Sequence, residues 1–167
     1  MATRKTAAKP TAANKERRAA AKLRKLRSHA ETQVEEYLRG VGFEDPSELK
    51  DRGSYLLDLG DVVGSATVQA IDGEMTYTVS AEVLPLPSDR ELVVPLLREL
   101  LELNAEIRGP ARLAVVGDTV FAGVQDPVEL MPDPDFGRYI DATLGVAHGA
   151  MKRLVKKYGK TVRKRRR

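Results

Sequence analysis

The 167-residue sequence contains no cysteine and no tryptophan, and its only histidines are His29 and His148. Without cysteine, disulfides and thiolate zinc sites are excluded, and two histidines leave little material for a histidine-based metal site. Aromatic residues are limited to five tyrosines and three phenylalanines, so platforms for stacking bases or sugars are scarce. We therefore expect neither a metal nor a cofactor.

Long apolar runs are also absent. No run approaches the ~20 residues of a membrane-spanning helix, and the basic start leads into no apolar segment of the signal-peptide type. An Arg- and Ala-rich, acid-poor start also fits an organelle transit peptide, but serine is absent from the first 27 residues. The sequence predicts a cytoplasmic protein with no membrane span.

The residues of a catalytic site are equally scarce. No Ser/His/Asp or Cys/His set is available, and the segment from Gly60 to Gly64 lacks the lysine of a phosphate-binding loop. A divalent-ion site is conceivable where four carboxylates cluster, but helix capping and the helix dipole explain them as well. These carboxylates are Asp126, Glu129, Asp133 and Asp135. We predict a protein that is not an enzyme.

Charge is present in three blocks. Residues 1–27 carry ten Lys/Arg and one acid, and residues 152–167 carry ten and none, whereas 28–151 carry eight against 23 acids. The net charges of the blocks are therefore +9, +10 and −15. Blocks of like charge repel, stay solvated and act as interaction tails, whereas the body between them must bury a core.

This charge map suggests three parts. Residues 1–27 form a basic, Ala/Lys-rich arm that is disordered to helical, 28–158 form an α+β domain, and 159–167 form a basic tail. Apolar residues recur at helical spacing between Leu23 and Val41. Either one long helix covers about 15–39 with Asn14 as its N-cap, or the domain helix begins near Ser28 behind a loosely helical arm.

The remaining pattern predicts the order α-βββ-α-ββ-α, with an antiparallel sheet packed against helices. Asp72-Gly73 between two β-rich runs is a strong signal for a hairpin with a type I′ turn. The apolar face of the last helix continues through Leu154 to Tyr158 inside the basic C-terminal block. The predicted segments after the first helix are strands 54–59, 62–71 and 74–84, a helix 90–107, strands 112–116 and 119–124, and a last helix from Asp133-Pro134 onward.

The helix over 90–107 is unusually apolar. Its apolar residues occupy an arc of about 220°, whereas a helix packed on one sheet needs only ~100°. We therefore expect cover on two sides: the sheet covers the first side, and either the terminal helices of the same chain or a partner covers the second. The surface offered to a second copy or an extended client is Leu96, Leu97, Leu100 and Leu101.

Two other residues of this helix carry specific expectations. Pro95 removes one backbone hydrogen bond, so we expect a kink there or a helix that begins there. Asn104 falls within the apolar arc, and a buried amide left unpaired costs about 1–3 kcal/mol. Asn104 should therefore bond a strand end or the loop at Gly109-Pro110, as a structural residue.

Three runs of this chain resemble one known family. They are TVSAEVLPLP from Thr78, LLRELLELN from Leu96 and GPARLAVVGDTV from Gly109, and together with the order of elements they look like the YbjN family. That family is grouped by fold with the type III secretion chaperones. The resemblance covers roughly residues 30–157 and implies a small non-enzymatic domain that dimerises and binds extended polypeptide. The basic arms are not part of the family pattern.

The two basic arms contain the cations that would bind a polyanion. With no aromatics between the charges, binding to nucleic acid is expected to be electrostatic and independent of sequence. Alternatively, the arms only solubilise the chain or fold back on its acidic body, or they bind an anionic membrane or an acidic partner. The residues concerned are Arg17, Arg18, Lys22, Arg24, Lys25, Arg27, Lys156, Lys157, Arg163, Lys164, Arg165, Arg166 and Arg167.

Two functional hypotheses follow. The first is a chaperone-like or regulatory polypeptide-binding module that forms a homodimer through the leucine-rich helix or holds a client polypeptide. The second is a nucleic-acid- or ribosome-associated protein, in which the body is a spacer or dimeriser and the arms bind phosphate non-specifically.

Overall fold

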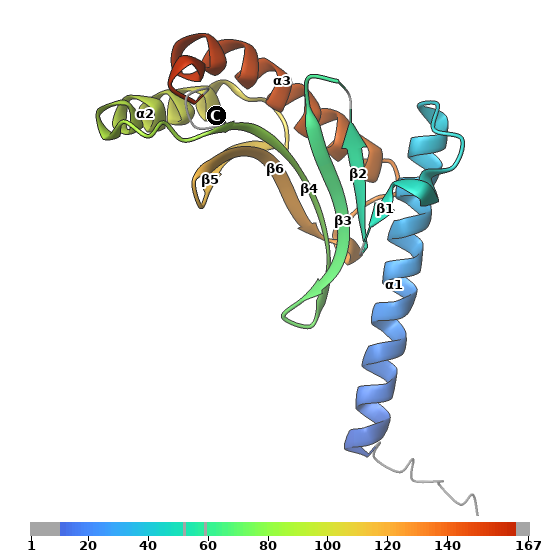
Figure 1. Cartoon of the computed structure of the whole chain (residues 1–167). Helices are drawn as coiled ribbons and strands as arrows, with labels where there is room; N and C mark the ends of the chain where they lie inside the picture. Colours follow the sequence, from blue (N-terminus) through green and yellow to red (C-terminus); the bar gives the residue numbers. More distant parts are fainter. Residues whose placement is uncertain (1–10, 52, 59, 163–167) are drawn as a thin grey trace, which may run out of the picture.

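The computed structural model describes residues 11–162 except 52 and 59, with side chains placed as far as residue 159 (Figure 1). The described elements are α1 (Ala12–Gly40), the 3₁₀ helix η1 (Pro46–Leu49), β1 (Lys50–Asp51), β2 (Ser54–Asp58), β3 (Val63–Ile71), β4 (Glu74–Pro85), α2 (Arg90–Glu106), β5 (Arg112–Val116), β6 (Thr119–Pro127), the 3₁₀ helix η2 (Val128–Leu130) and α3 (Asp135–Val162).

The described strands form one antiparallel sheet in the order β1-β2-β3-β4-β6-β5. The predicted α+β class and α-βββ-α-ββ-α order are confirmed, with β1 as an addition. Nothing in the sequence predicts β1, because Lys50–Asp51 has no apolar or β-branched residue. Its position is supported from outside the sheet, since the Lys50 Nζ lies 2.9 Å from a carboxylate oxygen of Glu31 on α1.

The turn between β3 and β4 has the predicted geometry. Asp72 and Gly73 have φ angles of 50° and 85°, as a type I′ turn requires at both central positions. Among the described residues other than glycine, Asp72 alone has a positive φ. The turn aligns Ile71 with Glu74 and thereby fixes the register of β3 against β4.

One face of the sheet carries the core. Along β4, Tyr77, Val79 and Ala81 are buried and pack in the same cluster as residues of all three helices. The Tyr77 hydroxyl donates to the Phe136 carbonyl at the start of α3, 3.1 Å away. The alternate positions Thr78 and Ser80 point to the opposite, less buried face. The helices therefore cover one side of the sheet (Figure 1).

Helix α1 is continuous from Ala12 to Gly40, which is the first of the two arrangements left open by the sequence. Its N-cap is Thr11 and not Asn14, and no cap forms at Ser28. Residues 11–22 are exposed and project past the sheet in Figure 1. The first buried residue of α1 is Ala30. The charge break between residues 27 and 28 thus lies inside an unbroken helix.

Helix α2 begins at Arg90, so the expectation of a start at Pro95 is wrong. Asp89 is the cap, and its carboxylate accepts from the Glu91 N–H at 3.0 Å. Capping by Asp89 fixes the first turn, and Pro95 lies inside the helix.

At the other end of the chain, Leu154 and Tyr158 on α3 are buried, so the body holds the helical part of the basic C-terminal block.

Helix α1 packs tightly against α3 at Gly137. A Cβ at this position would lie 2.1 Å from a ring carbon of Tyr37, whose hydroxyl donates to Asp141. We predict that Gly137→Ala lowers the free energy of unfolding by about 1–3 kcal/mol, because the Tyr37 ring has to move out of a packed interface. Urea unfolding of the purified variant measures this change.

Gly145→Ala on the same helix is the matched control. A Cβ at Gly145 meets no atom within 4 Å, so the substitution should be neutral or stabilise the protein by up to ~1 kcal/mol through helix propensity. Equal stability of the two variants would show that Tyr37 does not constrain position 137.

Candidate functional site

The structure divides the four leucines that the sequence assigned to one surface. Leu96 and Leu100 are 0% and 5% exposed and lie in the core, so they are not available to a partner. Leu97 and Leu101 are 40% and 71% exposed, and Val94, one turn earlier, is 65% exposed. We call Val94, Leu97 and Leu101 the α2 stripe. The large exposed apolar residues of α2 that a partner can reach are therefore those of the α2 stripe, which is narrower than the predicted apolar arc of 220°.

The edge of the sheet next to α2 is also apolar. β5 is the last strand of the sheet on this side and packs against α2. Val115 and Val116 of this strand are both exposed. Val115 points to the same face of the sheet as Leu113, which belongs to the core under α2. The α2 stripe is thus accompanied by a short strand whose outer edge has no partner strand among the described residues.

A buried carboxylate fixes the orientation of α2. Glu99 is only 7% exposed and accepts hydrogen bonds from Arg153 Nε at 3.0 Å, Lys157 Nζ at 2.7 Å and the Tyr158 hydroxyl at 3.1 Å, all on α3. These donors cover the side of α2 that carries Glu99. The sheet covers one side of α2 at β5, and the chain's own last helix covers the second side, which is the first of the two alternatives that the sequence left open. The α2 stripe stays exposed beside these two covers.

The ionisation of Glu99 follows from this arrangement. The hydrogen bond from Lys157 is the largest influence and lowers the pKa of Glu99, and the bonds from Tyr158 and Arg153 act in the same direction against the opposing effect of burial. The same contact raises the pKa of Lys157. Glu99 is consequently a charged group held between α2 and α3.

The sequence analysis did not identify Glu99 as a buried residue. A signal for its burial was available, since Glu99 follows Leu96 by three residues and precedes Leu103 by four. At 3.6 residues per turn this spacing lies on the buried face of the helix. What the sequence does not provide is the donor set, because Arg153 and Lys157 lie more than fifty residues away.

Asn104 closes the corner between α2 and β5. Its Nδ2 donates to the Leu113 carbonyl at 2.9 Å, and its Oδ1 accepts from the Leu113 N–H at 2.8 Å. The partner is the beginning of a strand, which is one of the two kinds of partner expected for this side chain. These paired bonds connect the end of the α2 helix to the edge strand of the sheet.

The basic residues assigned to polyanion binding have different surroundings. Three of them contact acids of the body: Lys22 lies 2.5 Å from Glu129, Arg27 lies 2.9 Å from Glu31, and Lys157 binds Glu99. Those that form no ion pair with a described acid are Arg17, Arg18, Arg24, Lys25 and Lys156. Arg163, Lys164, Arg165, Arg166 and Arg167 lie outside the described residues.

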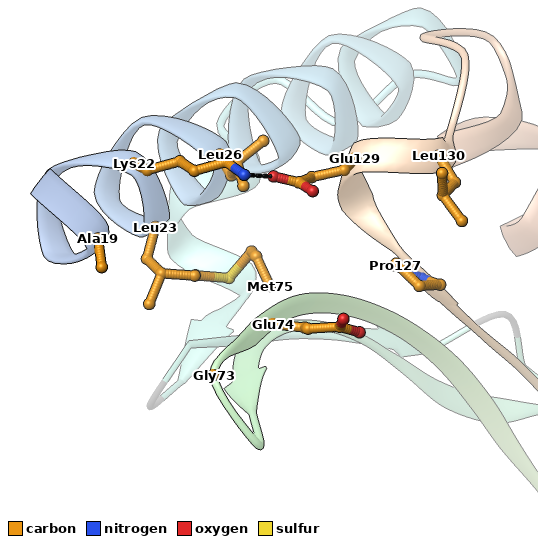
Figure 2. A pocket seen from close by; sticks show the side chains of 10 residues that line it. All are labelled: Ala19, Lys22, Leu23, Leu26, Gly73, Glu74, Met75, Pro127, Glu129 and Leu130. Atoms are coloured by element: carbon orange, nitrogen blue, oxygen red, sulfur yellow. Dashed lines mark ion pairs between the residues drawn. The ribbon is translucent and has the colours of Figure 1, made fainter. Parts of the chain in front are cut away.

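A groove that the sequence analysis missed lies between α1 and the tip of the β3–β4 hairpin (Figure 2). Its volume is about 430 Å³. We call it the α1 groove. No sequence pattern indicates it, because its walls come from three segments far apart in the chain. They are Ala19, Lys22, Leu23 and Leu26 on α1, Gly73, Glu74 and Met75 at the hairpin, and Pro127, Glu129 and Leu130 after β6.

The carboxylates near the start of α3 each have a different partner. Tyr139 donates to Asp126 at 2.5 Å, Glu129 pairs with Lys22, His29 Nε2 lies 3.0 Å from Asp133, and Arg138 lies 2.9 Å from Asp135. The described residues contain no group of three or more His, Asp or Glu side chains arranged for a metal ion. Interaction with Asp126 and burial raise the pKa of Tyr139 to about 12, burial being the larger influence.

Over the described part of the chain, the helices are too polar or too short in their apolar stretches to cross a bilayer. His148 on α3 is exposed and forms no described ion pair. Neither histidine therefore belongs to a cluster of groups that resembles a catalytic site.

Comparison with known proteins gives structural matches without sequence matches. No model of a known protein family matches the chain, and no curated protein does. Among solved structures, a chain of the HopA1–SchA chaperone–effector complex has a TM-score of 0.55 at 15% identity, over 75% of this chain and 95% of that one. At this identity the match shows the fold alone.

Two further structures lie below a TM-score of 0.5. The complex of the Yersinia pestis type III secretion chaperone SycH with a fragment of YscM2 matches at 0.48 with 14% identity, over 72% of this chain and 98% of that one. YbjN from E. coli, described as a putative transcription regulator, matches at 0.44 with 18% identity, over 73% and 89%. Neither of these two matches carries the fold assignment, which rests on the chaperone–effector complex and confirms the predicted chaperone-like α+β fold.

The lowered pKa of Glu99 has a measurable consequence. A carboxylate whose pKa is lower in the folded state than its ordinary value of 4.5 stabilises the fold above about pH 4.5. This contribution is lost as the pH falls through the lowered pKa. We predict that Glu99→Gln reduces the free energy of unfolding at pH 7 by about 1–3 kcal/mol, because three hydrogen bonds lose their charged acceptor.

The difference between wild type and Glu99→Gln should shrink as the pH is lowered from 5 to 3, in urea titrations at each pH. Glu102→Gln, an exposed position of α2, is the control and should change stability by less than ~0.5 kcal/mol. A difference that stays constant over this range would contradict the role given to the Glu99 charge.

Proposed function

We propose that this chain is a non-enzymatic polypeptide-binding module that self-associates through the α2 stripe. The observation that carries the proposal is the exposure of Val94, Leu97 and Leu101 along one line of a helix whose other face is locked into the core. The proposal includes a chaperone-like or regulatory role for the protein and a cytoplasmic location. The fold it shares with a chain of a chaperone–effector complex supports it.

The α2 stripe suits a two-fold contact with a second copy. Val94 to Leu101 is two helical turns, or about 10 Å at 1.5 Å per residue. In a two-fold dimer the same patch serves both subunits, so two antiparallel copies of α2 bury two stripes at once. Each leucine removed from water contributes about 1.5–3 kcal/mol if it becomes fully buried. Val115 on the adjacent strand extends the apolar area.

The stripe does not need to reorganise in order to bind. Glu99 is held by three donors on α3, and Asn104 is bonded to the start of β5. These contacts fix the rotation of α2 about its axis, and with it the direction in which Leu97 and Leu101 point. Preorganisation of this kind reduces the cost of ordering side chains on association.

An extended client is the other occupant that the same surface admits. The outer edge of β5 presents main-chain N–H and C=O groups, and an added strand binds such an edge through backbone hydrogen bonds. Val116 is exposed beside this edge. A client strand and a second subunit would compete for this region only if the dimer contact extends onto β5.

The oligomeric state tests the proposal. We predict that the wild-type chain is a dimer and that Leu97→Ser/Leu101→Ser is a folded monomer, because the double substitution removes two exposed leucines without touching the core. Light scattering over a range of protein concentrations measures the mass. Leu56→Ser/Val63→Ser, which removes two exposed apolar residues from β2 and β3, is the matched control and should stay dimeric. A monomeric wild type would end the hypothesis.

A second function is favoured by one specific observation. Five exposed cations in the first half of α1 form no ion pair with a described acid: Lys15, Arg17, Arg18, Arg24 and Lys25. Such a helix can neutralise phosphates in any nucleic acid, with no sequence preference. In this reading the body positions the arm, and a dimer brings two arms to one polyanion.

Salt dependence distinguishes this second function. Each phosphate contact contributes about −0.9 to the slope of log K against log salt concentration on duplex DNA. We predict that Arg17→Ala/Arg24→Ala makes the slope shallower by roughly 2, measured by fluorescence anisotropy on a labelled generic duplex. Arg138→Ala, an exposed arginine of the body, should leave it unchanged. Absence of binding or of a salt slope in the wild type would exclude the nucleic-acid reading.

A further inference from the structure

We propose that the α1 groove binds an acidic amphipathic segment of another polypeptide. This site is separate from the α2 stripe, and its occupant is a partner of a particular chemistry. The inference goes beyond the proposed function, because it holds whether or not the chain dimerises. The wall of the groove that α1 forms consists of residues of the basic arm, before Ser28.

The groove offers partly uncovered apolar surface. Leu23 and Leu26 are half-buried against the core, and Met75 forms the floor beneath them (Figure 2). On the opposite rim Leu130 is 77% exposed, the largest exposed fraction among the large apolar residues of the described chain. A volume of about 430 Å³ is within the range of roughly 300–1,000 Å³ typical of sites that bury a ligand. Apolar side chains of a partner would find contacts on both walls.

The charges around the groove favour an acidic occupant. Lys15 precedes Ala19 by four residues, so it lies one turn further out on the same helical face, and Arg18 precedes Lys22 by four on the adjoining flank. Neither cation pairs with a described acid. On the other rim, Glu129 is neutralised by Lys22, whose Nζ lies 2.5 Å from the carboxylate (Figure 2). Glu74 at the hairpin also lines the groove and forms no ion pair with a described cation, so one unpaired acid stands against the two cations Lys15 and Arg18. Over residues 12–27 the helix carries seven cations and one acid.

The outer turns of the helix that forms this wall have few contacts with the body beyond the Lys22–Glu129 ion pair. Residues 11–22 are exposed throughout, and isolated helices shorter than about 12–15 residues are marginal in water even when rich in alanine. The packing of α1 against the body starts only at Leu23 and Leu26. A segment lying in the groove would add contacts to the outer turns and stabilise them.

Two other occupants fit less well. Residues 1–10 of the chain contain three cations and no acid, so their charge repels the arm. A nucleic acid would neutralise Lys15 and Arg18 but would leave the apolar side chains of the groove uncovered. An amphipathic segment with carboxylates on one side and aliphatic side chains on the other satisfies both walls.

The test uses the full chain and a labelled peptide of about 16 residues made of Leu, Ala and Glu, with Leu at helical spacing i, i+3, i+4 and i+7. Two companion peptides replace every Glu by Lys or every Leu by Ser. Fluorescence anisotropy at ~0.15 M salt gives the dissociation constants, and amide hydrogen exchange reports on residues 12–26. We expect the acidic amphipathic peptide to bind at least tenfold more tightly than either companion and to slow exchange in that segment.

Variants of exposed residues locate the site without endangering the fold. Leu130→Ser should weaken binding about three- to tenfold, as should Lys15→Glu/Arg18→Glu. Arg17→Glu/Arg24→Glu is the matched control, because it makes the same charge change on the face of α1 turned away from the groove, and it should change binding less than twofold. Leu97→Ser/Leu101→Ser should bind the peptide like the wild type, so this result is independent of dimerisation.

Several outcomes would overturn the proposal. They are no binding of the acidic amphipathic peptide below about 1 mM, equally tight binding of the lysine peptide, or equal losses from the two double charge reversals. A change in oligomeric state caused by Leu130→Ser would assign the groove to a second copy of this chain instead.

Discussion

The arrangement of this molecule depends on a carboxylate buried between two helices. Glu99 on α2 accepts from Arg153, Lys157 and Tyr158 on α3, and these residues are part of the helix that also covers the sheet. Because the charge is satisfied from one direction, α2 has one rotation about its axis in which Glu99 is paired. In that rotation Leu96 and Leu100 face the core, and Leu97 and Leu101 face outward.

The sequence was sufficient for the fold and only partly sufficient for the surfaces. The Asp72-Gly73 turn and the helical spacing of apolar residues between Leu23 and Val41 are local signals, and local signals predicted the elements and their order. The division of the four leucines depends on which side of α2 meets α3, and that is decided by contacts more than fifty residues apart. The α1 groove could not be predicted from the sequence for the same reason, since no single segment forms it.

The charge blocks have a structural meaning that their net values do not express. Lys22, Arg27 and Lys157 from the basic arms each contact an acid of the body, so the arms and the body are partly neutralised by one another. The remaining cations of the described part of the N-terminal arm form no ion pair with a described acid. They lie along an extended helix whose inner end is anchored by Ala30, Val34 and Leu38 in the core.

The unbroken path of α1 through residues 27 and 28 has a consequence for how this chain tolerates changes in length. A helix turns by 100° per residue, so one residue inserted between arm and body would turn Ala19 and Leu23 away from Met75 and bring Arg17 and Arg24 round towards the sheet. Seven inserted residues would restore the phase almost completely while moving the arm outward by about 10 Å. Helical phase, as well as composition, therefore determines which side of the arm faces the body.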